Sequence, residues 1–172
     1  MVRIAILGNS GSGKSTLAAR LSRELKLATL DLDTVAWVPG QEAVAREPAE
    51  AAALVRAFCL QHERWVMEGC YASLIEVALE ADPLLIWLDP GDEVCQAHCR
   101  ARPWEPHKYS SPAAQERNLA MLLEWVTGYA TREGELGRRA HAALFDRCRA
   151  RKIHWTRAAD DALIEAVSAA AA

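Results

Sequence analysis

The sequence lacks a long hydrophobic run, a signal peptide and a regular cysteine framework. No apolar stretch of its 172 residues approaches the roughly 20 residues that a transmembrane helix needs. The start, MVRIAIL, is shorter than the apolar core of a signal peptide. The five cysteines are odd in number and widely spread, which is typical of reduced thiols in the cytoplasm. We therefore expect a cytoplasmic protein that has no contact with membranes.

An overall excess of basic residues is also missing. The chain has 20 Lys and Arg and 23 Asp and Glu, which gives a net charge of −3. Residues 100–157 contain 12 of the basic residues and six acidic ones, so this region has a net charge of +6. The rest of the chain has a net charge of −9. A basic zone inside an acidic protein, without a helix-turn-helix pattern, favours an anionic small ligand. We expect no direct binding of nucleic acid.

What is present is the composition of one globular domain. The chain is 51% hydrophobic and 25% charged, and its length suits one compact domain over residues 1–172, as a monomer or homodimer. Apolar runs predict strands at 2–7, 27–32, 64–68, 83–89 and 152–156. Amphipathic or helix-forming stretches predict helices at 14–25, 48–62, 92–100, 113–129, 135–150 and 160–170. Strands that alternate with helices predict an α/β fold with a parallel sheet.

The stretch GNSGSGKST follows the first predicted strand and opens the first predicted helix. It matches the P-loop pattern G-x-x-x-x-G-K-[ST] in full. Glycines let backbone N–H groups turn around a phosphate chain, and the start of the helix adds further N–H donors. Lys14 is suited to the β- and γ-phosphates, and the Ser15 hydroxyl to Mg²⁺. The predicted ligands of an ATP cofactor are Gly8, Asn9, Ser10, Gly11, Ser12, Gly13, Lys14, Ser15 and Thr16.

Three classes of protein use such a loop: small-molecule kinases, switch GTPases and ATP-binding regulatory modules. The guanine-specific motif N-K-x-D follows none of the later strands, which argues against a switch GTPase. The kinase and the regulatory module remain.

Several motifs of this chain occur in the same order as in a known family. These are GNSGSGKST, LDLDTVAW followed by PG, RWVMEGCY, ADPLLIWLD and KIHWTR. The chain resembles small kinases of the adenylate, shikimate and gluconate kinase group. It is most similar to the topology-modulation-protein-like branch of adenylate-kinase-related P-loop proteins. The resemblance implies a five-stranded parallel sheet in the order 2-3-1-4-5.

Acidic residues follow the second predicted strand, at the edge where ligands bind in open α/β sheets. Asp31 and Asp33 share one face if the strand extends to Asp33. A carboxylate here can hold Mg²⁺ through water or act as general base on an acceptor, and the resemblance implies one of these roles for Asp33. A helix N-cap is the alternative role for Asp33. Trp37 is interpreted as a wall of the acceptor pocket or, equally, as a core residue.

The ends of the third and fourth strands supply further candidates. The resemblance places Glu68, Gly69 and Tyr71 on the acceptor, although the family usually has Asp-Gly-Asn-Tyr where this chain has Glu-Gly-Cys-Tyr. Asp89 ends the fourth strand like a Walker-B acid and is a candidate for the Mg²⁺ shell, with a simple turn residue as the alternative.

Arginines that stabilise the transferring phosphoryl group are expected in a lid at about residues 100–118. Arg100 and Arg102 match the start of the family's lid, and Arg132 matches its second arginine segment. The resemblance places Arg157 at a position that, in such kinases, lies next to the adenine base of ATP.

Two departures from the family remove positive charge from the acceptor side. The stretch ASLIEVALE replaces a segment that often carries an arginine, and Pro90-Gly91-Asp92 replaces a family Pro-Arg. A phosphorylated acceptor is therefore less supported. Cys95, His98 and Cys99 suggest a metal site, but a structural zinc ion needs four convergent ligands, so helix packing by the cysteines is favoured.

The sequence thus predicts an ATP- and Mg²⁺-dependent kinase of a small molecule. Lys14, Asp33 and the lid arginines Arg100, Arg102 and Arg132 form its predicted catalytic set. The alternative is a nucleotide-binding regulatory protein that turns ATP over weakly and acts on DNA topology through unknown partners.

Overall fold

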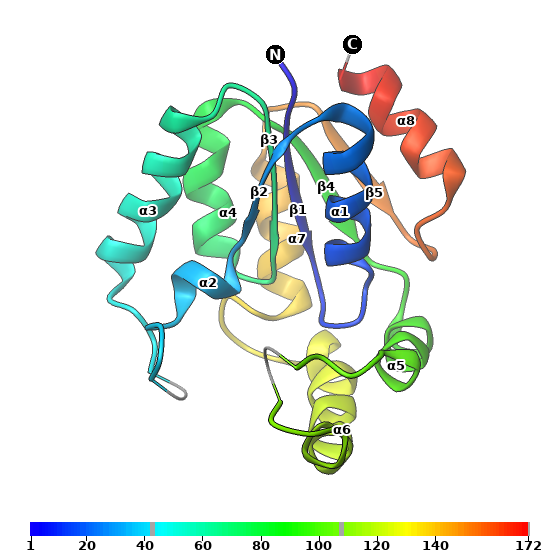
Figure 1. Ribbon diagram of the computed structural model, residues 1–172. Coiled ribbons are helices and arrows are strands. Elements are labelled where there is room, and N and C mark those ends of the chain that lie inside the picture. The colour runs from blue at the N-terminus through cyan, green and yellow to red at the C-terminus, as the bar shows by residue number, and fades with distance from the viewer. Residues whose placement is uncertain (42–43, 107–108, 172) are drawn as a thin grey trace.

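The fold is a parallel sheet covered by helices on both faces (Figure 1). The structure is a computed structural model that describes residues 1–41, 44–106 and 109–171. Within these residues, five parallel strands form one sheet in the order β2-β3-β1-β4-β5. The strands are β1 (Arg3–Gly8), β2 (Ala28–Asp31), β3 (Trp65–Gly69), β4 (Leu84–Leu88) and β5 (Lys152–Trp155). The predicted α/β class and the strand order implied by the resemblance are confirmed.

Helices form two layers on the sheet and a lobe at one end. One face is covered by α1 (Lys14–Leu25) and α8 (Asp161–Ala171), and the other by α3 (Pro48–Gln61), α4 (Ala72–Ala78) and α7 (Arg138–Arg147). At the carboxyl end of the strands lie α5 (Asp92–Ala101) and α6 (Pro112–Thr127), drawn at the bottom of Figure 1. The remaining short helices are α2 (Asp33–Ala36), η1 (Leu79–Ala81) and η2 (Gly128–Ala130). Among the helices described, none is long and apolar enough to cross a bilayer.

The central strands are apolar on both sides because both faces of the sheet are buried. Along β1, Ile4 and Ile6 pack into the cluster under α1 and α8, while Ala5 and Leu7 pack into the cluster under α3, α4 and α7. This two-residue alternation is repeated in β4. The sequence predicted these strands well because buried parallel strands are nearly continuous hydrophobic runs.

The structure differs from the expected elements in a few places. The second strand ends at Asp31 and α2 begins at Asp33, so the two carboxylates do not share a strand face. Helix α4 was not foreseen, and α7 begins at Arg138, three residues later than predicted. Helix α6 begins one residue earlier than predicted, where Ser111 caps it: its side chain accepts a hydrogen bond of 3.1 Å from the Ala114 N–H.

Candidate active site

A cleft of about 600 Å³ lies at the carboxyl ends of the strands. Its walls are the loop after β1, the ends of β2 and β3, the end of α5 with the segment after it, and the loop between β5 and α8. The lining residues are Ser10, Gly11, Gly13, Lys14, Ser15, Thr16, Asp31, Asp33, Glu68, Gly69, Cys70, His98, Ala101, Arg102, Pro103, Glu105 and Ala159. The P-loop and the predicted acceptor acids therefore face one continuous space.

The P-loop requires glycine for two different reasons. Gly11 and Gly13 have φ angles of +77° and +95°, in the left-handed region that other residues rarely adopt. A Cβ on Gly11 would also lie 2.3 Å from the Cys95 carbonyl oxygen, and one on Gly8 would lie 2.4 Å from the Leu88 carbonyl oxygen. Backbone of α5 and β4 thus packs directly on the loop and holds its shape.

Side chains from the α5–α6 lobe hold the same loop. His98 Nδ1 donates to the Gly11 carbonyl over 2.7 Å. The buried side chain of Asn9 donates through Nδ2 to the Val126 carbonyl at the end of α6, over 3.0 Å. Lys14 Nζ donates to the carbonyl of Asn9, at 2.9 Å. The loop is therefore fixed to α5 and α6 as well as to β1.

The acid that contacts the P-loop hydroxyl is Glu68. Ser15 Oγ donates to Glu68 Oε1 over 2.6 Å, and Glu68 pairs in register with Ile6 of the neighbouring β1. Glu68 is 7% exposed. Its burial raises the pKa of its carboxyl, while the charge of Lys14 and the hydrogen bond from Ser15 act in the opposite direction. A hydroxyl and a carboxylate in this contact are suited to share a hard cation such as Mg²⁺.

Asp89, the predicted Walker-B acid, has a different environment. Its carboxylate accepts from Arg138 Nη2 at 2.7 Å and from His154 Nε2 at 3.2 Å. It is absent from the described residues that line the cleft. The strand order explains the difference, because β4 and β3 flank β1 on opposite sides and the carboxylate that reaches Ser15 belongs to β3.

Asp33 is held by a chain of hydrogen bonds. Tyr71 OH donates to Asp33 Oδ1 over 2.8 Å, and Trp37 Nε1 donates to Tyr71 OH over the same distance. Burial, followed by the charge of Asp33, raises the pKa of Tyr71 well above its usual range, so the phenol remains a donor. Asp33 is the first residue of α2, whose N-cap position is Leu32, so Asp33 is not an N-cap. Asp31 Oδ1 accepts from the Asp33 N–H at 2.9 Å. Trp37 is 41% exposed, so it is not a core residue, and it lies outside the described lining of the cleft, where it contacts Tyr71 instead.

Tyr71→Phe tests this positioning role. We expect kcat of acceptor-dependent ADP release to fall about tenfold with little change in the KM for ATP, because Asp33 would lose the donor that orients it. A purely structural role would lower the melting temperature and leave kcat per folded molecule unchanged. Steady-state kinetics and thermal melting on the same preparation separate the two.

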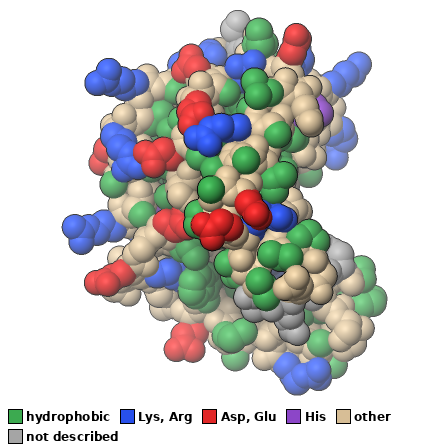
Figure 2. All heavy atoms as spheres, turned by 90° about the vertical axis from the view of Figure 1, so that its left-hand side faces the viewer, with side chains coloured by type: hydrophobic (Ala, Val, Ile, Leu, Met, Phe, Trp, Pro, Cys, Tyr) green, Lys and Arg blue, Asp and Glu red, His purple; other side chains and the backbone are tan. Residues whose placement is uncertain are grey.

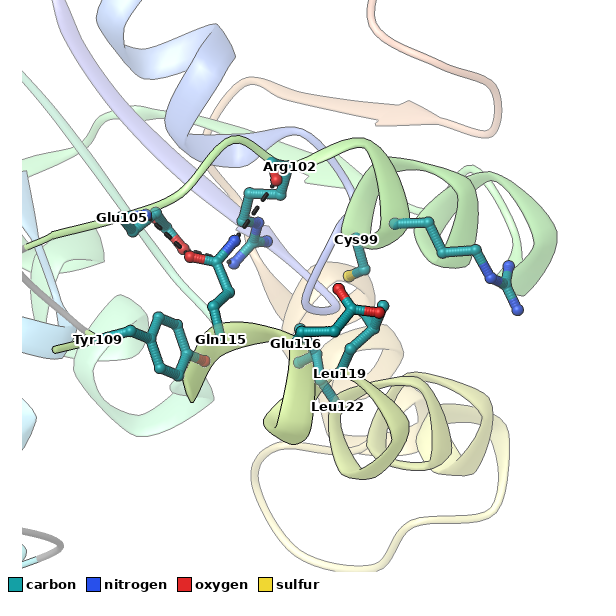
Figure 3. A pocket seen from close by; sticks show the side chains of 9 residues that line it. Cys99, Arg102, Glu105, Tyr109, Gln115, Glu116, Leu119 and Leu122 are labelled. Carbon is teal, nitrogen blue, oxygen red and sulfur yellow. Dashed lines mark hydrogen bonds and ion pairs between the residues drawn. The ribbon is translucent and has the colours of Figure 1, made fainter. Parts of the chain in front are cut away.

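Of the predicted lid arginines, Arg102 lines the cleft and pairs with Glu105 at 3.4 Å. Arg100 donates to Gln96 and lines a smaller pocket of about 40 Å³, which shares Arg102 and Glu105 with the cleft. Figure 3 shows this pocket, where Gln115 of α6 bonds to the Glu105 N–H and the Arg102 carbonyl. The pocket is far too small for a nucleotide, so the large cleft is the candidate site.

Arg132 and Arg157 lie outside the described lining of the cleft. Arg132 donates to the carbonyls of Trp125 and Leu136, and its guanidinium lies 3.4 Å from the centre of the Trp125 ring. Arg157 bonds to Asp160 and lies over Trp155. Sequence spacing did not reveal these partners. His107 and Lys108 of the predicted lid are outside the described residues, and α6 begins within the predicted lid.

The structure adds a buried polar network that sequence reasoning missed. His141 of α7 is 0% exposed. Its Nε2 donates to the Cys70 carbonyl at 2.8 Å, and its Nδ1 accepts from Tyr129 OH at 2.7 Å. Trp87 Nε1 donates to the same Tyr129 hydroxyl at 3.2 Å. The network joins β4, η2 and α7 to the end of β3, where the acceptor side of the cleft begins. Its only sequence signal is a histidine on an otherwise apolar helix face.

The cysteines of α5 belong to the packing of the lobe. Cys95 and Cys99 are buried with Val126 in a small apolar cluster, and the His98 side chain contacts the P-loop instead. No group of three or more His, Cys, Asp and Glu side chains placed to hold a metal ion occurs in the described part of the chain. This finding is compatible with Mg²⁺ on a P-loop, where phosphates and water supply most ligands.

Comparison with known families adds to this geometry. A model of the NACHT domain matches residues 2–136, which is more than half of the chain. The chain belongs to the NACHT domain family. No curated protein matches the sequence. The specific topology-modulation branch receives no support from these comparisons.

Several solved structures similar to this NACHT-family chain are named as kinases. A shikimate kinase from Bacteroides thetaiotaomicron is 17% identical, with a TM-score of 0.59 and coverage of 96% of this chain and 93% of that one. A sugar kinase from Janibacter sp. is 16% identical, with a TM-score of 0.56 and coverage of 98% and 93%. A gluconokinase from Sinorhizobium meliloti is 18% identical, with a TM-score of 0.52 and coverage of 99% and 89%. At these identities the similarity establishes the fold, that of a P-loop NTPase.

Proposed function

We propose that this chain transfers the terminal phosphoryl group of ATP, with Mg²⁺, to a hydroxyl group of a small molecule. One observation carries the proposal: a single cleft of about 600 Å³ holds the P-loop with Lys14 on one side and the oriented carboxylate of Asp33 on the other. A protein that only binds a nucleotide does not need a positioned carboxylate beyond the phosphates. A kinase needs one to orient and deprotonate its acceptor.

On the donor side, residues 8–16 would enclose the phosphates. Helix α1 begins at Lys14, and the unsatisfied N–H groups and positive dipole end of a helix start favour anions. The cation of Lys14 would exchange the Asn9 carbonyl for phosphate oxygens, a stronger charge-assisted hydrogen bond. Arg102, from the other wall of the cleft, would stabilise charge on the transferring group.

Ser15 and Glu68 are the groups that would hold Mg²⁺, with Asp33 close enough in the cleft to act through water. Glu68 takes this role in place of Asp89, whose carboxylate is paired with Arg138. The ion would neutralise phosphate charge and orient the terminal group.

In the transfer step, the acceptor oxygen forms a bond to the γ-phosphorus while the bond from that phosphorus to the β–γ bridging oxygen breaks. ADP leaves with the electron pair of the broken bond, and the acceptor's proton passes to Asp33. The similarity of the fold to kinases named for shikimate, gluconate and sugars supports transfer to a small hydroxyl compound. We place the protein in the cytoplasm and treat residues 1–172 as one catalytic domain.

The test is ADP release from Mg·ATP by the purified full chain with a panel of nucleosides, nucleoside monophosphates, sugars, amino sugars and sugar acids. We expect at least one acceptor to raise the rate clearly above that without acceptor. If ATP binds and no acceptor speeds its turnover, the kinase proposal is wrong. The nucleotide-binding regulatory protein, without efficient turnover, would then be the better description.

A further inference from the structure

Helix α5 turns one face toward the cleft. His98, Ala101 and Arg102 line the cleft, and their spacing of three and four residues is that of neighbours on one side of a helix. Figure 2 shows the α5–α6 lobe below a waist in the molecule, where it joins the body. Arg102 is the cation that would stabilise the transferring group, and His98 lies one helical turn before it. His98 itself has no task in the proposed transfer.

The hydrogen bond between His98 and the P-loop fixes which ring nitrogen carries the hydrogen. Nδ1 of His98 lies 2.7 Å from the Gly11 carbonyl oxygen. Because a carbonyl oxygen can only accept, Nδ1 is the donor, and Nε2 of the neutral imidazole is left with a lone pair. Within residues 1–41, 44–106 and 109–171, no group is hydrogen-bonded to this Nε2. The ring thus holds the P-loop through one nitrogen and keeps the other for a ligand.

The Gly11 carbonyl needs a donor outside the loop. Gly11 has a φ angle of +77°, and glycine has no Cβ to oppose rotation of the neighbouring peptide group. The N–H of that peptide group belongs to Ser12 and donates to the Asn9 carbonyl over 3.2 Å. His98 therefore holds the oxygen end of the peptide group while Asn9 holds its N–H end. Without the donor of His98, the carbonyl could turn toward the phosphates, which it would repel.

Nε2 of His98 belongs to the same cleft as the phosphate-binding loop. Ser10, Gly11, Gly13 and Lys14 line the cleft together with His98. A neutral imidazole would present a lone pair to phosphate oxygens, whereas a protonated imidazole would donate a charge-assisted hydrogen bond to them. Histidine is the side chain that ordinarily changes its charge between about pH 5 and pH 8. A change of pH in this range therefore switches Nε2 between repelling and binding a phosphate.

Other charged side chains share the cleft with His98. Within the described residues, those that line it are Lys14, Asp31, Asp33, Glu68, Arg102 and Glu105. They come from the start of α1, the ends of β2 and β3, the start of α2 and the segment after α5. Because substitutions at His98 leave all of them in place, a difference in pH profile between the wild type and a His98 variant reports on His98.

We propose that His98 is a phosphate-binding residue in which each ring nitrogen has a separate task. The Nδ1–H group holds the Gly11 carbonyl away from the nucleotide. The Nε2–H group, present when the imidazole has taken a proton from solvent, donates to an oxygen of the phosphate chain. This inference deepens the donor side of the proposed function: it rests on binding of a nucleotide by the P-loop and needs no acceptor.

Two variants of His98 separate the two tasks. The side-chain amide nitrogen of asparagine occupies the position of Nδ1, so His98→Asn keeps a donor for the Gly11 carbonyl and deletes Nε2. His98→Ala deletes both nitrogens. His62→Asn is the matched control, because His62 follows the end of α3 and lies outside the described lining of the cleft. His98 is exposed, so its variants should remain folded, which thermal melting verifies.

The measurement is the Kd of a fluorescent ATP analogue with Mg²⁺ for the purified full chain, from about pH 6 to about pH 9. We expect the Kd of His98→Asn to exceed that of the wild type about tenfold at the acid end and to equal it at the alkaline end, because the wild type loses its charged donor as the pH rises. The ratio cancels the titration of the nucleotide's own phosphates. His98→Ala should bind several-fold more weakly than His98→Asn at every pH, and His62→Asn should bind like the wild type throughout.

The outcomes that overturn the inference differ from those that overturn the kinase. A ratio of Kd between His98→Asn and the wild type that is the same at all pH values rules out the contact of Nε2 with the phosphates. Equal Kd values in His98→Asn and His98→Ala rule out the task of Nδ1. If the nucleotide binds with the expected pH dependence and no acceptor speeds ADP release, the kinase proposal fails and the role of His98 stands. If the wild type binds no nucleotide, both fail.

Discussion

Lys14→Ala is expected to reduce acceptor-dependent ADP release about 10³-fold and to weaken ATP binding as well. Lys14 is 8% exposed, and its ammonium lies within the P-loop, 2.9 Å from the Asn9 carbonyl oxygen. Removing it deletes the cation that the loop holds for the β- and γ-phosphates, and single preorganised groups of this kind account for about 10²–10³ in rate. Initial rates and titration with a fluorescent ATP analogue measure the two effects.

Asp33→Asn is the informative comparison, because it leaves the P-loop and Lys14 unchanged. The amide can still accept from Tyr71 OH but cannot take a proton from the acceptor. We expect turnover to fall about 10²-fold or more and ATP affinity to stay within about twofold. Full activity in Asp33→Asn would remove Asp33 from the mechanism.

Arg23→Ala is the matched control for the loss of a cation. Arg23 lies exposed in the last turn of the same helix that Lys14 begins. Turnover in this variant should equal that of the wild type. If Lys14→Ala behaved like Arg23→Ala, the P-loop would not bind phosphates in the way proposed.

Acidification is expected to destabilise the protein through His141. Burial lowers the pKa of this imidazole to about 4, whereas an exposed histidine has about 6.5. Between these values the unfolded chain binds more protons, so the free energy of unfolding decreases as the pH falls from 6.5 through 4. The loss should be about 2 kcal/mol between pH 7 and pH 5 and about 3 kcal/mol once the pH is below 4. Urea unfolding at several pH values measures it.

Two variants isolate the contribution of His141. In His141→Gln the part of the free energy of unfolding that depends on the titration of His141 should disappear. This variant starts from a lower stability at pH 7, because Tyr129 and the Cys70 carbonyl lose their hydrogen-bond partner. Tyr129→Phe keeps the imidazole and should keep the pH dependence at a reduced stability. An equal dependence on pH in wild type and His141→Gln would contradict the assignment.

This network also bears on function, because its last member is the Cys70 carbonyl. That carbonyl follows Glu68 and Gly69 directly, and all three residues line the cleft. A charged imidazole could no longer accept from Tyr129, so the end of β3 would lose a fixed support at the pH where stability falls. The acceptor side of the site and the fold thus depend on the same neutral histidine.

The sequence by itself determined the α/β class, the place of the central strands and the P-loop. Each depends on local chemistry. A continuous apolar run such as PLLIWLD forms a buried strand in many contexts. The glycines of GNSGSGKST adopt positive φ angles, which glycine reaches easily whatever its neighbours are. The order of the strands came from resemblance, since it depends on contacts between segments far apart in the chain.

Only the tertiary structure decided which charged side chains share the cleft. Glu68 and Asp89 look alike in sequence, each at the end of an apolar strand, but β3 carries its acid to Ser15 and β4 carries its acid to Arg138. Arg102 and Arg132 likewise look alike as lid arginines, but Arg102 lines the cleft and Arg132 donates to the carbonyls of Trp125 and Leu136. A side chain's partner depends on which segments the fold brings together, and that is a property of the whole sheet rather than of any local stretch.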